Sequence, residues 1–291
     1  MRSFLSMHVL WLVLTGSAVA APYKALYVFG DSYSDIGARY LDSDGPTAAA
    51  YLAEYMGIVL TYPQDPNAGG KSLDFAASGA PSGREPGYPG YMVGGRHWCC
   101  QGMTDQVEDF ARKVRDGSIV FDPKNTLFFI AGGLNDKDLP TTITIRNLTQ
   151  QISLLKEVGA YHISLALLPT QIPDFAALAE RLNPSYRHLA SSLGRKLHID
   201  LRLNHWGPYF DEVMKAPSAY GISNTTSKCA GRALFDEDAT PCSMPETYYY
   251  YHDGHPSTAV HRVVGDKLYR EISSESLNHL QDVVGQNRQR Q

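Results

Sequence analysis

Residues 25–35 read ALYVFGDSYSD, an apolar run that gives way at Gly30 to a short polar segment. The run Ala25–Phe29 has no polar alternation and stops at a glycine, which predicts a buried strand followed by a sharp turn. A strand that is apolar on both faces belongs in a parallel sheet covered by helices on both sides. Asp31 and Ser32, which follow the turn, are therefore expected at the carboxyl edge of such a sheet.

The same alternation of strand and helix continues along the chain. The predicted strands are 72–75, 126–130, 162–168 and 198–203, and the predicted helices are 46–56, 104–115, 143–158, 174–196 (interrupted at Pro184), 206–214 and 257–273. Segments 82–102 and 217–246 are predicted loops. Without a repeat or a linker, this pattern indicates one α/β domain over 21–291, a three-layer α/β/α sandwich, with a loosely ordered tail after Ser273.

Residues 1–20 have the organisation of a secretory signal peptide. A basic residue at position 2 precedes the apolar core 9–14, and Ala18-Val19-Ala20 supplies a small-x-small site, with cleavage expected after Ala20. The core is shorter than the ~20 residues of a spanning helix, so a membrane anchor is the weaker alternative. No later segment is apolar and long enough to span. A secreted, extracellular protein without a stable membrane anchor is expected.

The composition is that of a globular protein, with 43% hydrophobic residues, 19% charged residues and a net charge of −4. The chain has no basic stripe, which argues against nucleic acid as a partner. A monomer is expected. Asn147 and Asn224 begin N-glycosylation sequons, which together with the export signal suggest a eukaryotic glycoprotein.

Cysteine usage agrees with an oxidising compartment. The cysteines are Cys99, Cys100, Cys229 and Cys242. We favour a disulfide between Cys229 and Cys242, because these two bracket one polar loop. Whether the adjacent Cys99 and Cys100 pair with each other stays open. A zinc site is the poorer alternative because no CxxC spacing occurs.

Polar clusters follow three of the predicted strands and precede the last helix. They are Gly30–Asp35 (GDSYSD), Ala76–Ala80 (AASGA), Gly132–Asp136 (GGLND) and His252–Ser257 (HDGHPS). In an open parallel sheet, ligands bind where the carboxyl ends of the strands meet. We therefore expect these clusters to share one site.

These clusters resemble, in the same order, the four sequence blocks of the GDSL or SGNH hydrolases. Phe29-Gly30-Asp31-Ser32, Gly79, Gly133-Leu134-Asn135-Asp136 and His255-Pro256-Ser257 match the nucleophile, glycine, GxND and histidine blocks, and the resemblance spans Leu26 to Val264. Within that family, the chain is similar to fungal secreted esterases of carbohydrate esterase family 16. The resemblance implies a flavodoxin-like SGNH-hydrolase fold with a mainly five-stranded parallel sheet, and hydrolysis of carboxylic esters through an acyl-enzyme.

Ester hydrolysis needs an activated nucleophile and fixed donors for the oxyanion. Ser32 is the expected nucleophile and His255 its base, although a serine after a strand is also a good helix N-cap. The resemblance implies that the oxyanion is held by the backbone N–H of Ser32, the backbone N–H of Gly79 and the side-chain amide of Asn135. Asp35 is expected to be structural, and so is Asp136.

The acid of the catalytic triad is the one departure from the family pattern. The family carries an aspartate three residues before the histidine, where this chain has His252. Asp253, two residues before His255, is the candidate acid. Alternatively, a backbone carbonyl or another acid orients His255.

Other functions fit the sequence less well. The GxSxG elbow is absent because Ser34 stands in place of its second glycine. The spacings of His252, His255 and His261 match no familiar zinc motif, and no GxGxxG follows a strand, so neither a metal nor another cofactor is expected. A catalytically silent binding module stays a third alternative.

The substrate is expected to be an acylated carbohydrate or a lipid. Segment 82–102 is rich in glycine and tyrosine and has no amphipathic lid helix, which favours short acyl esters such as acetyl groups on plant polysaccharides. A lipase or phospholipase is the second choice.

Overall fold

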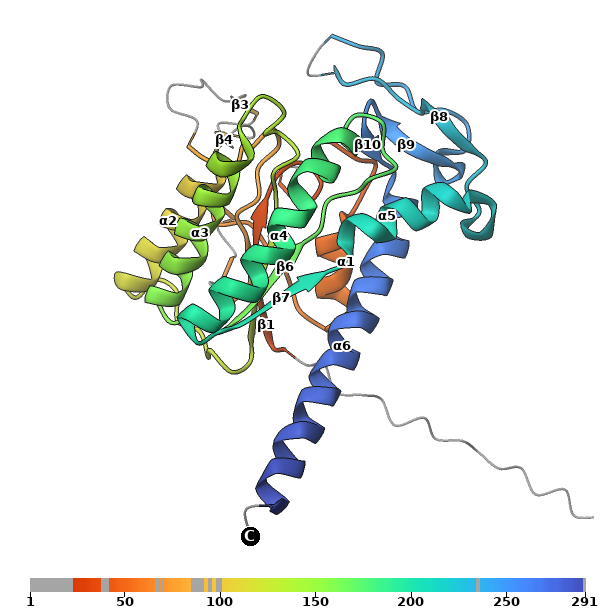
Figure 1. Ribbon diagram of the computed structural model, residues 1–291. Helices are drawn as coiled ribbons and strands as arrows, with labels where there is room; N and C mark the ends of the chain where they lie inside the picture. Colours follow the sequence, from red (N-terminus) through yellow and green to blue (C-terminus); the bar gives the residue numbers. More distant parts are fainter. Residues whose placement is uncertain are drawn as a thin grey trace, which may run out of the picture.

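The computed structural model describes residues 23–37, 42–65, 68–69, 71–84, 92–93, 96–97, 101–233 and 236–289, without the side chains of 92–93, 96–97 and 275–289. These residues form a central sheet with helices on either side (Figure 1). The predicted signal peptide lies outside the described residues, as do Cys99 and Cys100.

The central sheet has five parallel strands in the order β2-β1-β5-β6-β7. They are β1 (Ala25–Gly30), β2 (Leu73–Asp74), β5 (Thr126–Ala131), β6 (His162–Ala166) and β7 (Asp200–Asn204). All six residues of β5 are buried, as the unbroken apolar run predicts for a strand covered on both faces. The five-stranded parallel sheet and its flavodoxin-like order are therefore confirmed.

Helices cover both faces of the sheet. They are α1 (Ala48–Tyr55), α2 (Met103–Arg115), α3 (Thr141–Glu157), α4 (Ala176–Leu197), α5 (Trp206–Lys215) and α6 (Thr258–Gln289). Helices α2, α3 and α4 pack in sequence on one side, whereas α6 packs against both α1 and α5 on the other (Figure 1). Among the described residues, no helix combines the length and the apolar character that crossing a bilayer requires.

A second small sheet extends one end of the molecule (Figure 1). It contains β8 (Asn224–Lys228), β9 (Tyr248–His252) and β10 (His255–Pro256), with short 3₁₀ turns at Pro217–Tyr220 and Pro245–Thr247. A separate two-stranded ladder joins β3 (Met92–Val93) and β4 (Arg96–His97). The prediction of a continuous loop over 217–246 is therefore wrong for β8, whose sequence NTTSK has no apolar residue to signal a strand.

Helix α4, strand β7 and helix α6 differ from the prediction in instructive ways. Helix α4 runs without a break through Pro184, since Pro184 is exposed and water can reach the carbonyl group that its ring leaves unpaired. Strand β7 begins at Asp200 because His198, at φ 54°, ends α4 in the left-handed conformation. Helix α6 continues past Ser273 to Gln289, where the sequence predicts a loose tail.

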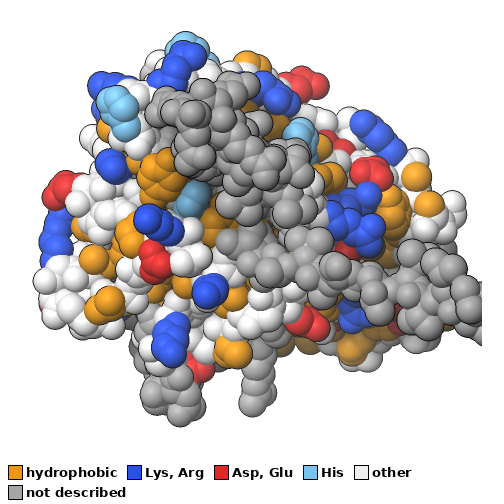
Figure 2. Space-filling model, turned by 90° about the horizontal axis from the view of Figure 1, so that it is seen from below, with side chains coloured by type: hydrophobic (Ala, Val, Ile, Leu, Met, Phe, Trp, Pro, Cys, Tyr) orange, Lys and Arg blue, Asp and Glu red, His pale blue; other side chains and the backbone are white. Residues whose placement is uncertain are grey.

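Charged side chains of both signs are scattered among uncharged ones on the face seen in Figure 2. Neither sign gathers into a stripe on that face, in keeping with the small net charge of −4. The visible surface therefore has the mixed character of an ordinary globular protein.

Gly30 is a point of close approach between two strands at the carboxyl edge of the sheet. The buried Gln106 carboxamide accepts a hydrogen bond from the Gly30 N–H (3.0 Å) and donates one to the Gly30 carbonyl (2.9 Å). A Cβ atom at Gly30 would lie 2.3 Å from the Ala131 carbonyl oxygen, on the neighbouring strand. Only glycine fits here, and the turn that carries Ser32 begins at this residue.

We predict that Gly30→Ala lowers the free energy of unfolding by about 3 kcal/mol, because the new methyl group forces two paired strands apart. Gly117→Ala is the matched comparison. Gly117 has a positive φ of 80° but open space around it, so only backbone strain of about 1 kcal/mol is expected. Urea unfolding of both variants tests this, and equal losses would contradict the packing argument.

Candidate active site

Ser32 and His255 are in hydrogen-bond contact although they are 223 residues apart in the chain. Ser32 lies in the turn after β1, and His255 opens β10. The distance from Ser32 Oγ to His255 Nε2 is 2.8 Å. The structure therefore brings the predicted nucleophile and its predicted base together.

A backbone carbonyl holds the other nitrogen of the imidazole. His255 Nδ1 lies 2.8 Å from the carbonyl oxygen of Asp253. A carbonyl oxygen only accepts hydrogen bonds, so Nδ1 carries the proton and Nε2 presents its lone pair to the Ser32 hydroxyl. This is the tautomer that a general base needs.

The Asp253 carboxylate does not take the expected position of the triad acid. Its side chain is 73% exposed and forms an ion pair with Lys228 Nζ at 2.6 Å. Gly254, at φ 67°, turns the chain so that the carbonyl group of Asp253, and not its side chain, faces the imidazole. The side-chain assignment is thus corrected in favour of the backbone alternative.

Tyr33 supports the turn that carries His255. Its hydroxyl donates a hydrogen bond to the Gly254 carbonyl, and its ring centroid lies 5.5 Å from that of His255. The Tyr33 ring is completely buried between Phe175, Trp206 and Phe210. The residue after the nucleophile therefore anchors the loop of the base to the hydrophobic core.

The two other oxyanion candidates lie next to each other. Gly79 adopts φ 74°, and the Asn135 amide nitrogen donates to the carbonyl of Ala80 at 3.0 Å. Ala77 N–H donates to the Gly30 carbonyl at 3.2 Å. Hydrogen bonds thus connect the segments after β1, β2 and β5 at one edge of the sheet.

Asp35 and Asp136 have the structural roles predicted from the sequence. The Asp35 carboxylate accepts from Gly37 N–H (2.6 Å) and Ser78 N–H (2.8 Å), which ties the nucleophile segment to the glycine segment. The Asp136 carboxylate accepts from Ser82 N–H (2.8 Å) and the Thr144 hydroxyl (2.7 Å).

Arg232 and Asp42 lie beside His255, and the sequence analysis did not find them. Arg232 Nη2 contacts His255 Nδ1, and Arg232 Nη1 lies 3.1 Å from Asp42 Oδ1. Asp42 Oδ1 also lies 3.8 Å from His255 Nε2. Neither residue belongs to a recognisable motif, so no sequence signal could have placed them here.

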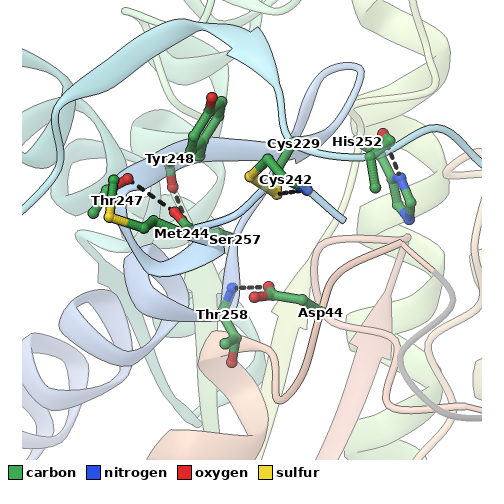
Figure 3. The surroundings of a disulfide bond; sticks show 10 residues. Asp44, Cys229, Cys242, Met244, Thr247, Tyr248, His252, Ser257 and Thr258 are labelled. Carbon is green, nitrogen blue, oxygen red and sulfur yellow. Dashed lines mark hydrogen bonds between the residues drawn. A yellow bond between two sulfur atoms is a disulfide. The ribbon is translucent and has the colours of Figure 1, made fainter. Parts of the chain in front are cut away.

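The predicted disulfide between Cys229 and Cys242 is confirmed, and it closes the loop that contains Arg232. Figure 3 shows this bond close to β9, with His252 on one side and Tyr248 on the other. Cys229 N–H donates to the carbonyl groups of Tyr250 and Tyr251, and this fixes the start of the loop against β9.

The other histidines near the site have separate partners. His252 Nδ1 lies 3.1 Å from the Ala230 carbonyl oxygen, and His261 Nδ1 accepts the N–H of Ala48 at 3.1 Å. Burial lowers the pKa of His261 to about 3, so this imidazole is neutral. Burial also lowers the pKa of His255. The Asp42 carboxylate acts in the opposite direction and raises this pKa, whereas the Arg232 guanidinium lowers it.

Asp31, which precedes the nucleophile, is completely buried. Burial raises the pKa of its carboxyl group to about 7, although hydrogen bonds from the backbone of Tyr33 and Leu134 lower it. Its Oδ2 atom has no hydrogen-bond partner in the described part of the chain. The absence of donors around Oδ2 is consistent with a carboxyl group that keeps its proton below neutral pH.

The sequence model of the GDSL-like lipase/acylhydrolase family matches residues 26–268. The chain belongs to this family and is a hydrolase of ester bonds. The family resemblance predicted from the four motifs is confirmed. The similarity to carbohydrate esterase family 16 stays a prediction. No curated protein matched the sequence.

The chain is also similar to several solved structures. A lipolytic protein of the G-D-S-L family from Veillonella parvula is 14% identical, with a TM-score of 0.46 over 84% of this chain and 95% of that one. An inhibitor-bound aryl esterase from M. smegmatis is 12% identical, with a TM-score of 0.46 over 86% and 99%. The acetylxylan esterase Axe2 from Geobacillus stearothermophilus is 17% identical, with a TM-score of 0.44 over 87% and 95%.

We predict that Asp31→Asn gains stability relative to the wild type as the pH rises from about 4 to about 7. The folded carboxyl holds its proton to a higher pH than the unfolded one, so over this range the unfolded state binds fewer protons and the wild type loses stability. Over this pH range, the free energy of unfolding of Asp31→Asn relative to that of the wild type should rise by several kcal/mol, at about 1.4 kcal/mol per pKa unit. Urea unfolding of both proteins across this range measures it, and a pH-independent difference would contradict the buried, protonated state.

Proposed function

We propose that this chain is a secreted serine esterase in which Ser32 is the nucleophile and His255 is the general base. The 2.8 Å contact between Ser32 Oγ and His255 Nε2 carries the proposal. A serine hydroxyl is a weak nucleophile until a base accepts its proton, and Nε2 is the nitrogen whose lone pair is available.

The reaction has two halves. Ser32 Oγ attacks the ester carbonyl carbon while its proton passes to His255 Nε2, and the carbonyl electron pair moves onto oxygen. The intermediate then collapses, the bond to the alcohol oxygen breaks, and His255 returns the proton to the leaving alcohol. Water attacks the acyl group on Ser32 by the same route, which releases the acid and regenerates the hydroxyl.

The oxyanion needs donors that are in place before it forms. We assign them to the backbone N–H of Ser32, the backbone N–H of Gly79 and the side-chain amide of Asn135. One Asn135 amide hydrogen is engaged by the Ala80 carbonyl, which orients the group and leaves its second hydrogen for the substrate. Gly79, at φ 74°, has no side chain to obstruct the approach of a carbonyl oxygen.

The proposed substrates are short acyl esters, such as acetyl groups on plant polysaccharides, encountered outside the cell. The glycine- and tyrosine-rich segment 82–102 supports a polar substrate. The signal-peptide pattern of residues 1–20 and the disulfide between Cys229 and Cys242 support export.

The two sequons differ in exposure. The Asn147 side chain is buried in α3 and donates to the Ser82 hydroxyl at 3.0 Å. Asn224 lies at the start of β8 and is partly exposed. We therefore assign any N-linked glycan to Asn224.

The test is kcat/KM for p-nitrophenyl esters from acetate to palmitate, with Ser32→Ala as the control. We expect the wild type to favour acetate and Ser32→Ala to lose at least about 10⁴-fold in kcat. A maximum at long chains would replace the proposed substrates with lipids or phospholipids. A folded wild type that hydrolyses none of these esters would favour the silent binding module.

We predict that Asn135→Ala lowers kcat about 100-fold and changes KM little, because the amide acts on charge that develops only in the transition state. Asn125→Ala is the matched control, since Asn125 lies at the opposite end of β5 and pairs with Asp122. Steady-state kinetics on the preferred ester decide the point. An unchanged kcat in Asn135→Ala would remove this residue from the oxyanion site.

A further inference from the structure

Among the described residues, no carboxylate contacts Nδ1 of His255. The Asp253 carbonyl oxygen occupies that position, and a carbonyl carries no net charge to balance an imidazolium. Proton transfer from Ser32 nevertheless makes the ring cationic during catalysis. The charge balance around this ring therefore has to come from groups outside the four family motifs.

Arg232 places a positive charge next to the ring, which increases the need for a negative charge nearby. Its Nη2 atom contacts His255 Nδ1 and lies 3.4 Å from Nε2, so a guanidinium nitrogen lies beside the ring. The same atom lies 3.5 Å from the Asp253 carbonyl oxygen, which His255 Nδ1 also contacts. A guanidinium is always charged, and it opposes a second positive charge at this distance.

Asp42 is the carboxylate that contacts both groups. Its Oδ1 atom lies 3.1 Å from Arg232 Nη1 and 3.8 Å from His255 Nε2. The Asp42 side chain is only 5% exposed, and in the described part of the chain neither of its oxygens accepts a hydrogen bond. Because the side chain is buried, solvent screens its charge little, and the charge acts on the Arg232 guanidinium and on the His255 ring when that ring takes up a proton.

The other acidic groups near Arg232 are neutralised elsewhere. Lys228 Nζ pairs with Glu237 at 2.9 Å and with Asp253 at 2.6 Å. Glu237 also accepts the backbone N–H of Arg232 at 3.0 Å. Asp42 is the carboxylate whose recorded contacts are with Arg232 and His255, so it is the counter-charge that we assign to the site.

We propose that Asp42 and Arg232 are a pair of positioning residues for His255. The Arg232 guanidinium contacts the Asp253 carbonyl that orients the imidazole, and the Asp42 carboxylate stabilises the positive charge that arises when Nε2 takes the proton of Ser32. The pair fills the role left open by His252, which stands where the family carries its aspartate. This inference rests on the proposed serine mechanism.

Within the described residues, the titratable and charged side chains recorded next to the ring come from several segments. They are Tyr33 after β1, Asp42 before α1, Arg232 after β8, His252 in β9 and His261 in α6. Tyr33 is buried and its pKa is raised well above its usual value, and His261 is neutral. Burial lowers the pKa of His252. Asp42 and Arg232 are thus the groups of this set whose charges face His255 at neutral pH.

The decisive experiment is an NMR titration of His255 with histidine labelled at Cε1, assigned with His255→Gln. We expect Asp42→Asn to lower the His255 pKa by about one unit or more, and Arg232→Met to raise it by a similar amount. Asp266→Asn is the matched control, because it breaks an aspartate–arginine pair on the surface of α6 and should leave the titration unchanged.

Kinetics add a second readout. The acidic limb of kcat/KM follows the free base, so it should move to lower pH in Asp42→Asn and to higher pH in Arg232→Met. In Asp42→Asn, the plateau should also fall about tenfold or more, because the cationic intermediate loses its counter-charge. If the two residues had only a structural role, both variants would lose activity, but the acidic limbs of their kcat/KM profiles would not move in opposite directions.

The proposal would be overturned if the His255 pKa did not shift, or if it shifted in the same direction in Asp42→Asn and Arg232→Met. It would also be overturned if Asp253→Asn shifted the His255 pKa as much as Asp42→Asn does. If Asp42→Asn does not fold, a raised His255 pKa in Arg232→Met supports the proposal and an unchanged one overturns it. A wild type that hydrolyses no ester refutes the proposed function, whereas the NMR titration still decides whether this pair acts on His255.

Discussion

The buried carboxamide of Gln106 hydrogen-bonds both backbone groups of Gly30, and the remaining geometry of the site depends on this contact. It fixes the last residue of β1 directly against Ala131 of β5, at a separation that excludes any side chain. The turn carrying Ser32 therefore leaves the sheet at a fixed point. The Gly79 and Asn135 segments, which follow the neighbouring strands, are hydrogen-bonded to the same edge.

The base is placed by different means from the nucleophile. His255 lies outside the central sheet, on a small antiparallel ladder, and the buried ring of Tyr33 connects its turn to the core. A backbone carbonyl selects the tautomer, whereas the charges of Arg232 and Asp42 lie across the ring. In the usual catalytic triad, one carboxylate both orients the histidine and balances the positive charge that the histidine acquires. Here the two tasks fall to separate groups.

The sequence predicts the features that local chemistry controls. Apolar runs and, for β7, an alternating pattern located the five parallel strands, and the four motifs predicted the pairing of Ser32 with His255 and the family. Features that depend on tertiary contacts were missed. Strand β8 has no apolar residue, Pro184 is tolerated because it faces solvent, and Asp42 meets Arg232 only in the folded chain. The Asp253 carboxylate was misplaced because one positive φ, at Gly254, decides which of its oxygens faces the imidazole.

The disulfide between Cys229 and Cys242 encloses Arg232 within a short covalent ring. Such a ring removes many conformations that an open segment would sample, and the anchoring of Cys229 to β9 restricts it further. The long, freely rotating arginine side chain therefore starts from a backbone that is already fixed. The backbone entropy needed to place Arg232 beside the imidazole is lost when the chain folds and the disulfide forms. It is not lost again in each catalytic cycle.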